Sequence, residues 1–223
     1  MRLGLIGTGK QGQRYLEQRN GGRYIVKQIA GHDSPAELDG LDGVVIATHP
    51  AGHTPWAMEC IERGLPMLIE KPLALTWDEC DRILNAARLR APILMAHIDL
   101  WNTWLEMGSG SAVARIWYTD NKRDYSAWLD WAPHALAILA RADPKASPAE
   151  LARHVEVEQR GITLLQVRGD GWQYTRKPVD WPTPMLLMMH DFVHGIEHEL
   201  WFEPDETRRI YRALFSEEHG QGK

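Results

Sequence analysis

The chain has 223 residues, 44% of them hydrophobic and 25% charged, which suffices for one large domain or two small ones with a substantial core. A formal net charge of −5 argues against nucleic acid or an anionic membrane as a partner. The sequence opens directly into an apolar run, which predicts no signal peptide, and no run approaches the roughly 20 residues of a membrane span. Cys60 and Cys80 lack metal-ligand spacing, so we expect free thiols and a cytoplasmic location.

A glycine-rich turn follows the first predicted strand, residues 3–7, and leads into a predicted helix over 10–18. The turn is a G-x-G-x-x-G. In a strand–turn–helix setting these glycines allow a tight turn and let the backbone approach a phosphate at the helix N-terminus. The sequence therefore predicts a dinucleotide site here, with Gly7, Thr8, Gly9, Lys10, Gln11 and Gly12 as its residues.

Strands and helices alternate through residues 1–96, which predicts a parallel sheet with right-handed crossovers. The stretch from Gly12 to Glu70 is short for a dinucleotide fold, so we expect one strand–helix unit to be missing. The predicted strands are 3–7, 24–30, 44–48, 67–69 and 92–96, and the predicted helices are 10–18, 36–38, 54–63 and 77–89.

Two acidic positions bear on the same site. Glu70, with Lys71 and Pro72, follows the strand 67–69, and α/β sheets bind ligands at the C-terminal ends of their strands. Asp33 lies 21 residues past Gly12, near the spacing of the acidic residue that holds the adenosine ribose. The segment around Asp33 also matches a later part of such folds in which an aspartate has no cofactor role. Both interpretations of Asp33 stay open.

Four stretches together resemble the Gfo/Idh/MocA oxidoreductase family: residues 42–50, His53, residues 64–66 and residues 70–74. The resemblance covers residues 1 to about 96 well and the rest more loosely. It implies an N-terminal Rossmann domain, a C-terminal α+β domain with an open sheet, and NAD or NADP acting on sugars, inositols and related alcohols. It also implies further cofactor-binding residues, namely Thr48, His49, Pro50, His53, Glu70 and Lys71.

The second half, residues 97–223, has a different pattern. Strand-like runs at 112–119, 154–158, 161–167 and 172–176 predict a small, open antiparallel sheet. Predicted helices follow at 185–200 and 205–216, the second with Asp205 as its N-cap. The overall prediction is an α/β chain, with a reduced Rossmann-like parallel sheet in 1–96 and an α+β substrate and oligomerisation domain in 97–223. We expect the exposed sheet face to be apolar and covered by a second subunit in a homodimer or homotetramer.

Asp130 and His134 are four residues apart, so on a helix they share one face. This pair resembles the family's Asp-x-x-x-His element, and the resemblance implies that Lys71, Asp130 and His134 are catalytic. The chemistry is reasonable by itself. A histidine can take a hydroxyl proton near neutral pH, an aspartate beside it can fix its tautomer, and a lysine can stabilise an alkoxide. Pro72 is expected to follow a cis peptide bond, and Trp128 or Trp131 to line the substrate pocket. The alternative is a satisfied core histidine beside a solvated carboxylate.

Histidines recur every four residues at His190, His194 and His198, with Asp191 and Glu197 between them. This spacing could bind a divalent metal. A polar helix face has the same pattern, and we expect no metal.

These observations predict an NAD(P)-dependent oxidoreductase acting on a sugar-like or polyol small molecule. One alternative is a non-catalytic binding or regulatory protein that has lost cofactor affinity. Another is a reductase of an imine or conjugated substrate. The substrate, the choice between NAD and NADP and the reaction direction do not follow from the sequence.

Overall fold

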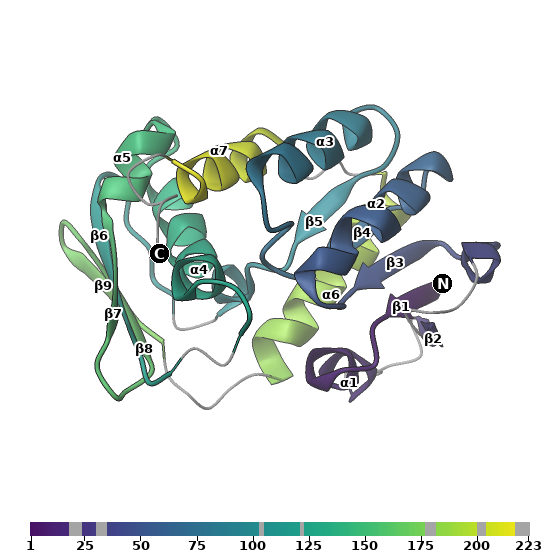
Figure 1. Cartoon of the computed structure of the whole chain (residues 1–223), viewed down its shortest axis with the longest axis horizontal. Coiled ribbons are helices and arrows are strands. Elements are labelled where there is room, and N and C mark those ends of the chain that lie inside the picture. Colours follow the sequence, from purple (N-terminus) through teal and green to yellow (C-terminus); the bar gives the residue numbers. More distant parts are fainter. Residues whose placement is uncertain are drawn as a thin grey trace. The chain divides into compact units, whose positions relative to one another are not determined.

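The computed structural model describes residues 1–17, 24–29, 35–102, 105–120, 123–176, 182–199 and 204–216. The chain forms two compact units, Met1–Ala96 with Met185–Pro204, and His97–Pro184 with Asp205–Lys223 (Figure 1). The sequence predicted one division after residue 96, whereas the chain here returns to the first unit through residues 185–204. In the parts of the chain that the structure describes, no helix combines the length and apolar character needed to cross a bilayer.

A five-stranded parallel sheet forms the centre of the first unit, in the order β2-β1-β3-β4-β5. Its central strands are buried because helices lie on both faces, which explains their nearly continuous apolar sequences. Dinucleotide folds commonly have six strands, so the five described here agree with the predicted loss of one unit. The strands are β1 Arg2–Ile6, β2 Ile25–Ile29, β3 Gly43–Ile46, β4 Met67–Ile69 and β5 Ile93–Met95.

Helices cover both faces of this sheet, with α2 and α3 on one side and α1 and α6 on the other (Figure 1). Thr76 caps α3 by accepting a hydrogen bond from the Glu79 amide at 3.3 Å. Cys60 and Cys80 are buried free thiols, as predicted. The helices of this unit are α1 Lys10–Glu17, α2 His53–Glu62, α3 Trp77–Ala87 and α6 Pro182–Glu197, with short 3-10 turns η1 Pro35–Leu38 and η2 Pro50–Gly52.

The second unit is built on a four-stranded sheet in the order β7-β6-β8-β9. The predicted antiparallel sheet is wrong in one respect, because β7 pairs with β6 in parallel. The reason is the connection: helices α4, Ala127–Ala142, and α5, Pro148–Arg153, carry the chain back as a crossover. The sequence analysis missed α5, which Ser147 and Glu150 begin with a capping box. The strands are β6 Ala112–Tyr118, β7 Val155–Gln159, β8 Leu164–Gly169 and β9 Trp172–Thr175.

Helix α7, Pro204–Leu214, packs against α4. Its first helical residue is Pro204, a position that suits proline, so Asp205 lies inside the first turn and is not the predicted N-cap. The indole of Trp128 donates to the Leu214 carbonyl at 2.7 Å, and Arg141 pairs with Glu206 at 2.9 Å. These contacts fix α4, the helix that carries His134 and Asp130, within its unit.

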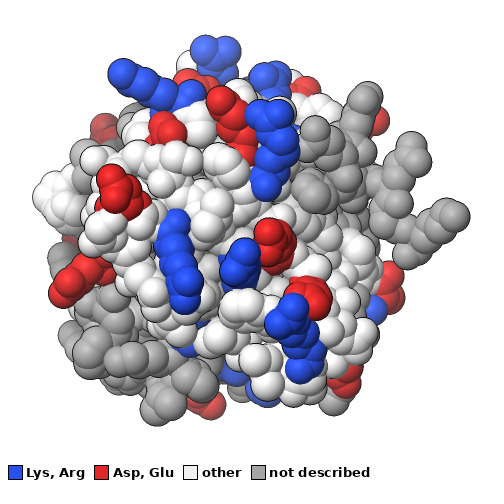
Figure 2. All heavy atoms as spheres, turned by 90° about the vertical axis from the view of Figure 1, so that its left-hand side faces the viewer, with Lys and Arg blue, Asp and Glu red and all other residues white. Residues whose placement is uncertain are grey.

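The outer face of the second sheet is charged, and Figure 2 shows basic and acidic side chains interleaved on it. Arg115 pairs with Glu156 at 2.9 Å, and Arg160 pairs with Glu158 at 2.7 Å. The predicted apolar face is therefore wrong in part. The outward positions of these strands hold charged residues, Arg115, Glu156 and Glu158, beside the apolar Val113 and Trp117. Assembly into a dimer or tetramer stays a prediction.

Candidate active site

The loops that follow β1, β3 and β4 start side by side at one edge of the first sheet. Backbone hydrogen bonds of 2.8–2.9 Å extend the ladder beyond the strands, from Ala47 to β1, from Glu70 to β3 and from Ala96 to β4. In the strand order, β2 lies on one side of β1 and β3 to β5 lie on the other, which makes the β1–β3 edge a topological switch point. Parallel α/β sheets bind ligands at such a point. The predicted cofactor residues that begin at this edge are Gly7 to Gly12 after β1, Thr48 to Pro50 after β3, and Glu70 with Lys71 after β4.

The glycine turn fits a phosphate group. Gly7 has a φ of +121°, and a Cβ there would lie 2.4 Å from the Ala47 carbonyl oxygen. A Cβ at Gly12 would lie 2.2 Å from the Gly7 oxygen, whereas one at Gly9 would meet nothing within 4 Å. Gly7 and Gly12 therefore let the turn form, and Gly9 faces open space. Thr8, Gly9 and Lys10 are exposed at the N-terminus of α1, whose first-turn amides lack partners within the helix.

A hydrogen-bonded network ties this turn to the end of β4. Glu70 Oε1 accepts from Gln11 Nε2 and from the Tyr15 hydroxyl, each at 2.7 Å. Burial raises the pKa of Glu70, although the two hydrogen bonds and the charge of Lys71 oppose the shift. Gln11 and Glu70 thus brace α1 against the sheet. The sequence analysis missed Tyr15; its position four residues after Gln11 on α1 was the available signal.

The residues after β3 have different environments. His49 is exposed, and its Nδ1 accepts from the Ala51 amide at 3.3 Å, which caps η2. Pro50 is buried, and Thr48 is half-buried. Asp33, which the sequence also predicted to bind the cofactor, lies outside the described residues.

His53 is fully buried and joins the loops after β3 and β4. Its Nδ1 lies 2.9 Å from the Pro72 carbonyl oxygen, and its Nε2 lies 3.1 Å from the Thr48 carbonyl oxygen. Burial lowers the pKa of His53, and a neutral ring can donate to only one of the two carbonyls. The Lys71–Pro72 peptide is cis, as predicted, and Lys71 is half-buried.

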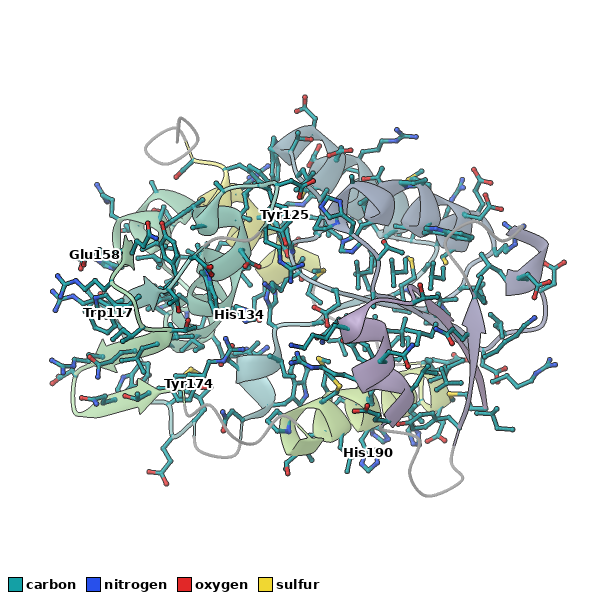
Figure 3. The ribbon with its side chains drawn as sticks, turned by 60° about the horizontal axis from the view of Figure 1, so that its bottom comes forward. Trp117, Tyr125, His134, Glu158, Tyr174 and His190 are labelled. Carbon is teal, nitrogen blue, oxygen red and sulfur yellow. The ribbon has the colours of Figure 1, made fainter. Side chains whose placement is uncertain are left out.

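The second unit holds His134 in a buried cluster of polar side chains (Figure 3). His134, on α4, is 5% exposed, and its Nδ1 lies 2.9 Å from Oδ2 of Asp99. Oδ1 of Asp99 accepts from the Tyr174 hydroxyl at 2.8 Å and lies 3.1 Å from Nε of Arg176. Asn102 donates to the same tyrosine hydroxyl at 3.1 Å. An imidazole whose Nδ1 faces a carboxylate keeps its proton there, which leaves Nε2 as the basic nitrogen.

Asp99 is ionised in this setting. Burial by itself would raise the pKa of Asp99, but the charge of Arg176 and the hydrogen bond and charge of His134 hold it well below its usual range. Sequence reasoning missed Asp99 entirely. It lies in η3, Ile98–Trp101, a few residues after β5, and the end of a strand was the only available signal.

Asp130, the predicted partner of His134, has other neighbours. Its Oδ2 lies 4.0 Å from Nε of Arg123. Burial and the charge of Asp130 raise the pKa of Tyr125 to about 12. Tyr125 lies just before α4 (Figure 3). The close carboxylate partner of His134 is thus Asp99, from outside its own helix.

The two tryptophans near this cluster also differ. The ring of Trp131 lies 6.4 Å from the ring of His134, centre to centre. Trp128 is instead engaged with the Leu214 carbonyl. Of the two predicted pocket residues, Trp131 is the one beside the histidine.

Comparison with known proteins bears on the first unit most directly. Residues 23–97 match a family model described as an oxidoreductase family with an NAD-binding Rossmann fold, GFO_IDH_MocA. This segment is therefore similar to the Rossmann domain of the Gfo/Idh/MocA oxidoreductases. The matched segment begins after the glycine turn and covers about a third of the chain.

Similar proteins include inositol dehydrogenases. Inositol 2-dehydrogenase 1 of Saccharopolyspora erythraea is 31% identical over 108 residues, which are 38% of this chain and 32% of that protein. The chain therefore aligns with about a third of this curated relative. A myo-inositol dehydrogenase from Corynebacterium glutamicum has a TM-score of 0.72 at 15% identity, with 98% of this chain and 96% of that chain covered. A scyllo-inositol dehydrogenase from Lactobacillus casei, solved with NAD(H) and scyllo-inositol, has a TM-score of 0.73 at 10% identity, with 98% and 96% covered. At these identities the solved structures share the fold with this chain.

Proposed function

We propose that the chain is an NAD(P)-dependent oxidoreductase that transfers a hydride between a nicotinamide and a sugar-like or polyol alcohol or ketone. The observation that carries the proposal is the buried pair of His134 and Asp99, in a chain whose residues 23–97 match an NAD-binding Rossmann domain. The inositol dehydrogenases among the similar proteins support a polyol substrate.

His134 is the proposed general acid and base. In the oxidising direction Nε2 takes the hydroxyl proton of the substrate, and in the reducing direction it returns a proton to the new alkoxide. Asp99 is a positioning residue: it holds the Nδ1 proton and stabilises the imidazolium that forms. Arg176 and Tyr174 keep Asp99 ionised and oriented, since both approach its other oxygen.

Lys71 is the proposed group that orients the reacting oxygen, because an ammonium can stabilise an alkoxide as it develops. Asp130 has at most an indirect role in this proposal, through Arg123 and Tyr125 at the start of α4, because Asp99 takes the place beside Nδ1 of His134.

A bound nicotinamide dinucleotide supplies the hydride acceptor or donor. The amides after Gly9 at the start of α1 would hold its pyrophosphate, with Thr48 and His49 at the neighbouring strand end. These groups are positioned by residues that hold their loops in place, namely Gln11, Glu70 and His53.

Cofactor binding is tested first. The chain has ten tryptophans, so their emission should report energy transfer to a bound reduced nicotinamide. We expect saturable transfer with NADH or NADPH, and the tighter of the two identifies the preferred dinucleotide. If neither binds at millimolar concentration, the proposal fails and the non-catalytic alternative replaces it.

Turnover of inositols and sugars tests the catalytic roles. We expect His134→Ala and Lys71→Ala each to lower kcat by about 10²-fold or more, with dinucleotide affinity unchanged in His134→Ala. His154→Ala is the matched control, because this half-buried histidine lies between α5 and β7 and has no proposed role. Near-normal kcat in both variants would contradict the roles given to Lys71 and His134. An active enzyme that reduces only imines or conjugated substrates would contradict the polyol assignment.

A further inference from the structure

The C-terminal end of α6 presents three metal-ligating side chains to solvent. His194, Glu197 and His198 are all exposed; the first two lie on α6, and His198 follows it directly (Figure 3, where His190 marks the preceding turn). Residues at i, i+3 and i+4 share one helix face, so the three side chains project from the same side. The spacing alone is also typical of an ordinary polar helix face. The geometry of the side chains is what distinguishes the two interpretations.

One ligand atom from each of the three residues lies within 4.8 Å of the other two. The rings of His194 and His198 are 4.2 Å apart between centroids, at an interplanar angle of 56°. A tetrahedral zinc ion with bonds of about 2.0–2.2 Å would need its ligand atoms roughly 3.4 Å apart. The two histidine rings already lie side by side, so we expect side-chain rotation to bring the ligand atoms to this spacing.

We propose that His194, Glu197 and His198 bind a divalent transition-metal ion of the zinc type. Two imidazoles and one carboxylate are a donor set that such ions favour, and solvent would fill the remaining coordination position. Among the described residues this is the one group of three such side chains with converging ligand atoms. It lies outside residues 23–97, the segment that matches the family model, and shares no residue with the proposed catalytic set.

The end of the helix favours a cation here. The last carbonyls of an α-helix carry a partial negative charge, and a positive charge near them is stabilising. The His198 amide donates to the His194 carbonyl at 3.1 Å, which closes the final turn, and Glu199 then leaves the helix with a φ of +53°. A metal bridging His194 and His198 would cross-link this turn and raise the thermal stability of the protein.

The probe is Zn²⁺ itself, titrated by calorimetry into chelator-treated protein that carries no affinity tag. We expect one ion per chain at this site, with the midpoint of thermal unfolding rising on saturation. His194→Ala and His198→Ala should each weaken binding at least about tenfold, because even the loss of a group that only supports a ligand has an effect of that size. Glu197→Gln, which keeps an oxygen but removes the charge, should weaken it less.

His190→Ala is the matched control, since it removes a histidine from the same helix one turn earlier. It should leave Zn²⁺ affinity unchanged, and circular dichroism should show the native helix content in every variant. The proposal is overturned if the wild type takes up no zinc or if His194→Ala and His198→Ala bind as the wild type does. It is also overturned if His190→Ala loses as much affinity as His198→Ala, because the ion would then lie between His190 and His194.

Discussion

Each unit holds a hydrogen-bonded carboxylate inside its candidate site, and the two differ in the charge of their partners. Glu70 is held mainly by neutral donors, Gln11 and Tyr15, and burial prevails, so its pKa is raised. Asp99 is also buried, but a guanidinium and an imidazole face it and its pKa is lowered. The contrast shows that strong positive charge on the partners decides whether the pKa of such a carboxylate ends above or below its usual value. It also suits the proposed roles, because Glu70 braces a loop whereas Asp99 has to stabilise an imidazolium.

The two sites also depend on different structural features, backbone conformation in the first and buried charge in the second. Gly7→Ala, in the first site, should cause the largest loss of stability. The turn depends on a φ of +121°, and an added Cβ would lie 2.4 Å from the Ala47 carbonyl oxygen. We expect a loss of about 4 kcal/mol in the free energy of unfolding, measured with urea, because backbone strain and a backbone clash combine. Gly9→Ala is the control: its Cβ has open space, so stability should hold while dinucleotide affinity falls. Equal stability of the two variants would contradict this account of the turn.

Asp99→Asn, in the second site, should cause a smaller loss of stability. The substitution removes the negative charge that faces Arg176 and His134, and breaking one side of a buried ion pair destabilises a protein by about 3 kcal/mol. Asp130→Asn is the matched control, on the helix that carries His134 but outside the Asp99 cluster. Its ion pair spans 4.0 Å to Arg123, whose side chain is 58% exposed, so the loss should be about 0.5 kcal/mol.

The same two variants, Asp99→Asn and Asp130→Asn, should also differ in kcat and in its pH profile. Asp99→Asn should flatten the pH profile of kcat and lower kcat by about tenfold or more, since the Nδ1 proton of His134 is no longer held by a charge. If Asp130→Asn has the larger effect on both stability and the pH profile, then Asp130 is the functional partner of His134, as the sequence predicted.

The difference between the units also explains what the sequence could predict. In the first unit the signals are local: β1 and β4 are apolar runs, the glycine turn has steric reasons within a few residues, and the cis Lys71–Pro72 bond lies in the recognised motif. The partner of His134 is not local. Asp99 receives Tyr174 from 75 residues away, a distance over which periodicity carries no information.

The predicted Asp130–His134 pair shows the same limit from the other side. Spacing on a helix finds residues that share a face, but it cannot reveal a carboxylate that another segment brings closer. The parallel pairing of β7 was missed for a related reason: the sequence analysis overlooked the six-residue helix α5, and without it the crossover from β6 was not apparent. Asp205 was assigned as a cap by residue type, whereas Pro204 already begins the helix.

The smallest expected effect, and the sharpest test of the comparison, is the pH dependence of the two carboxylates. A lowered pKa means that the stability contributed by Asp99 is present above its unfolded pKa of about 3.9 and is lost as pH falls through the folded value. The raised pKa of Glu70 has the opposite sign, because the folded state binds that proton more tightly. Stability therefore declines as pH rises from about 4.3 through the folded pKa.

Glu70→Gln keeps an oxygen that accepts from Tyr15 and Gln11 but cannot ionise. We expect it to match the wild type near pH 4 and to exceed it at pH 7 by less than about 1 kcal/mol, measured by urea unfolding across that range. The advantage of the wild type over Asp99→Asn should instead shrink as pH falls below about 4. Differences from the wild type that vary with pH in the same direction for both variants would show that the two carboxylates do not have opposite environments.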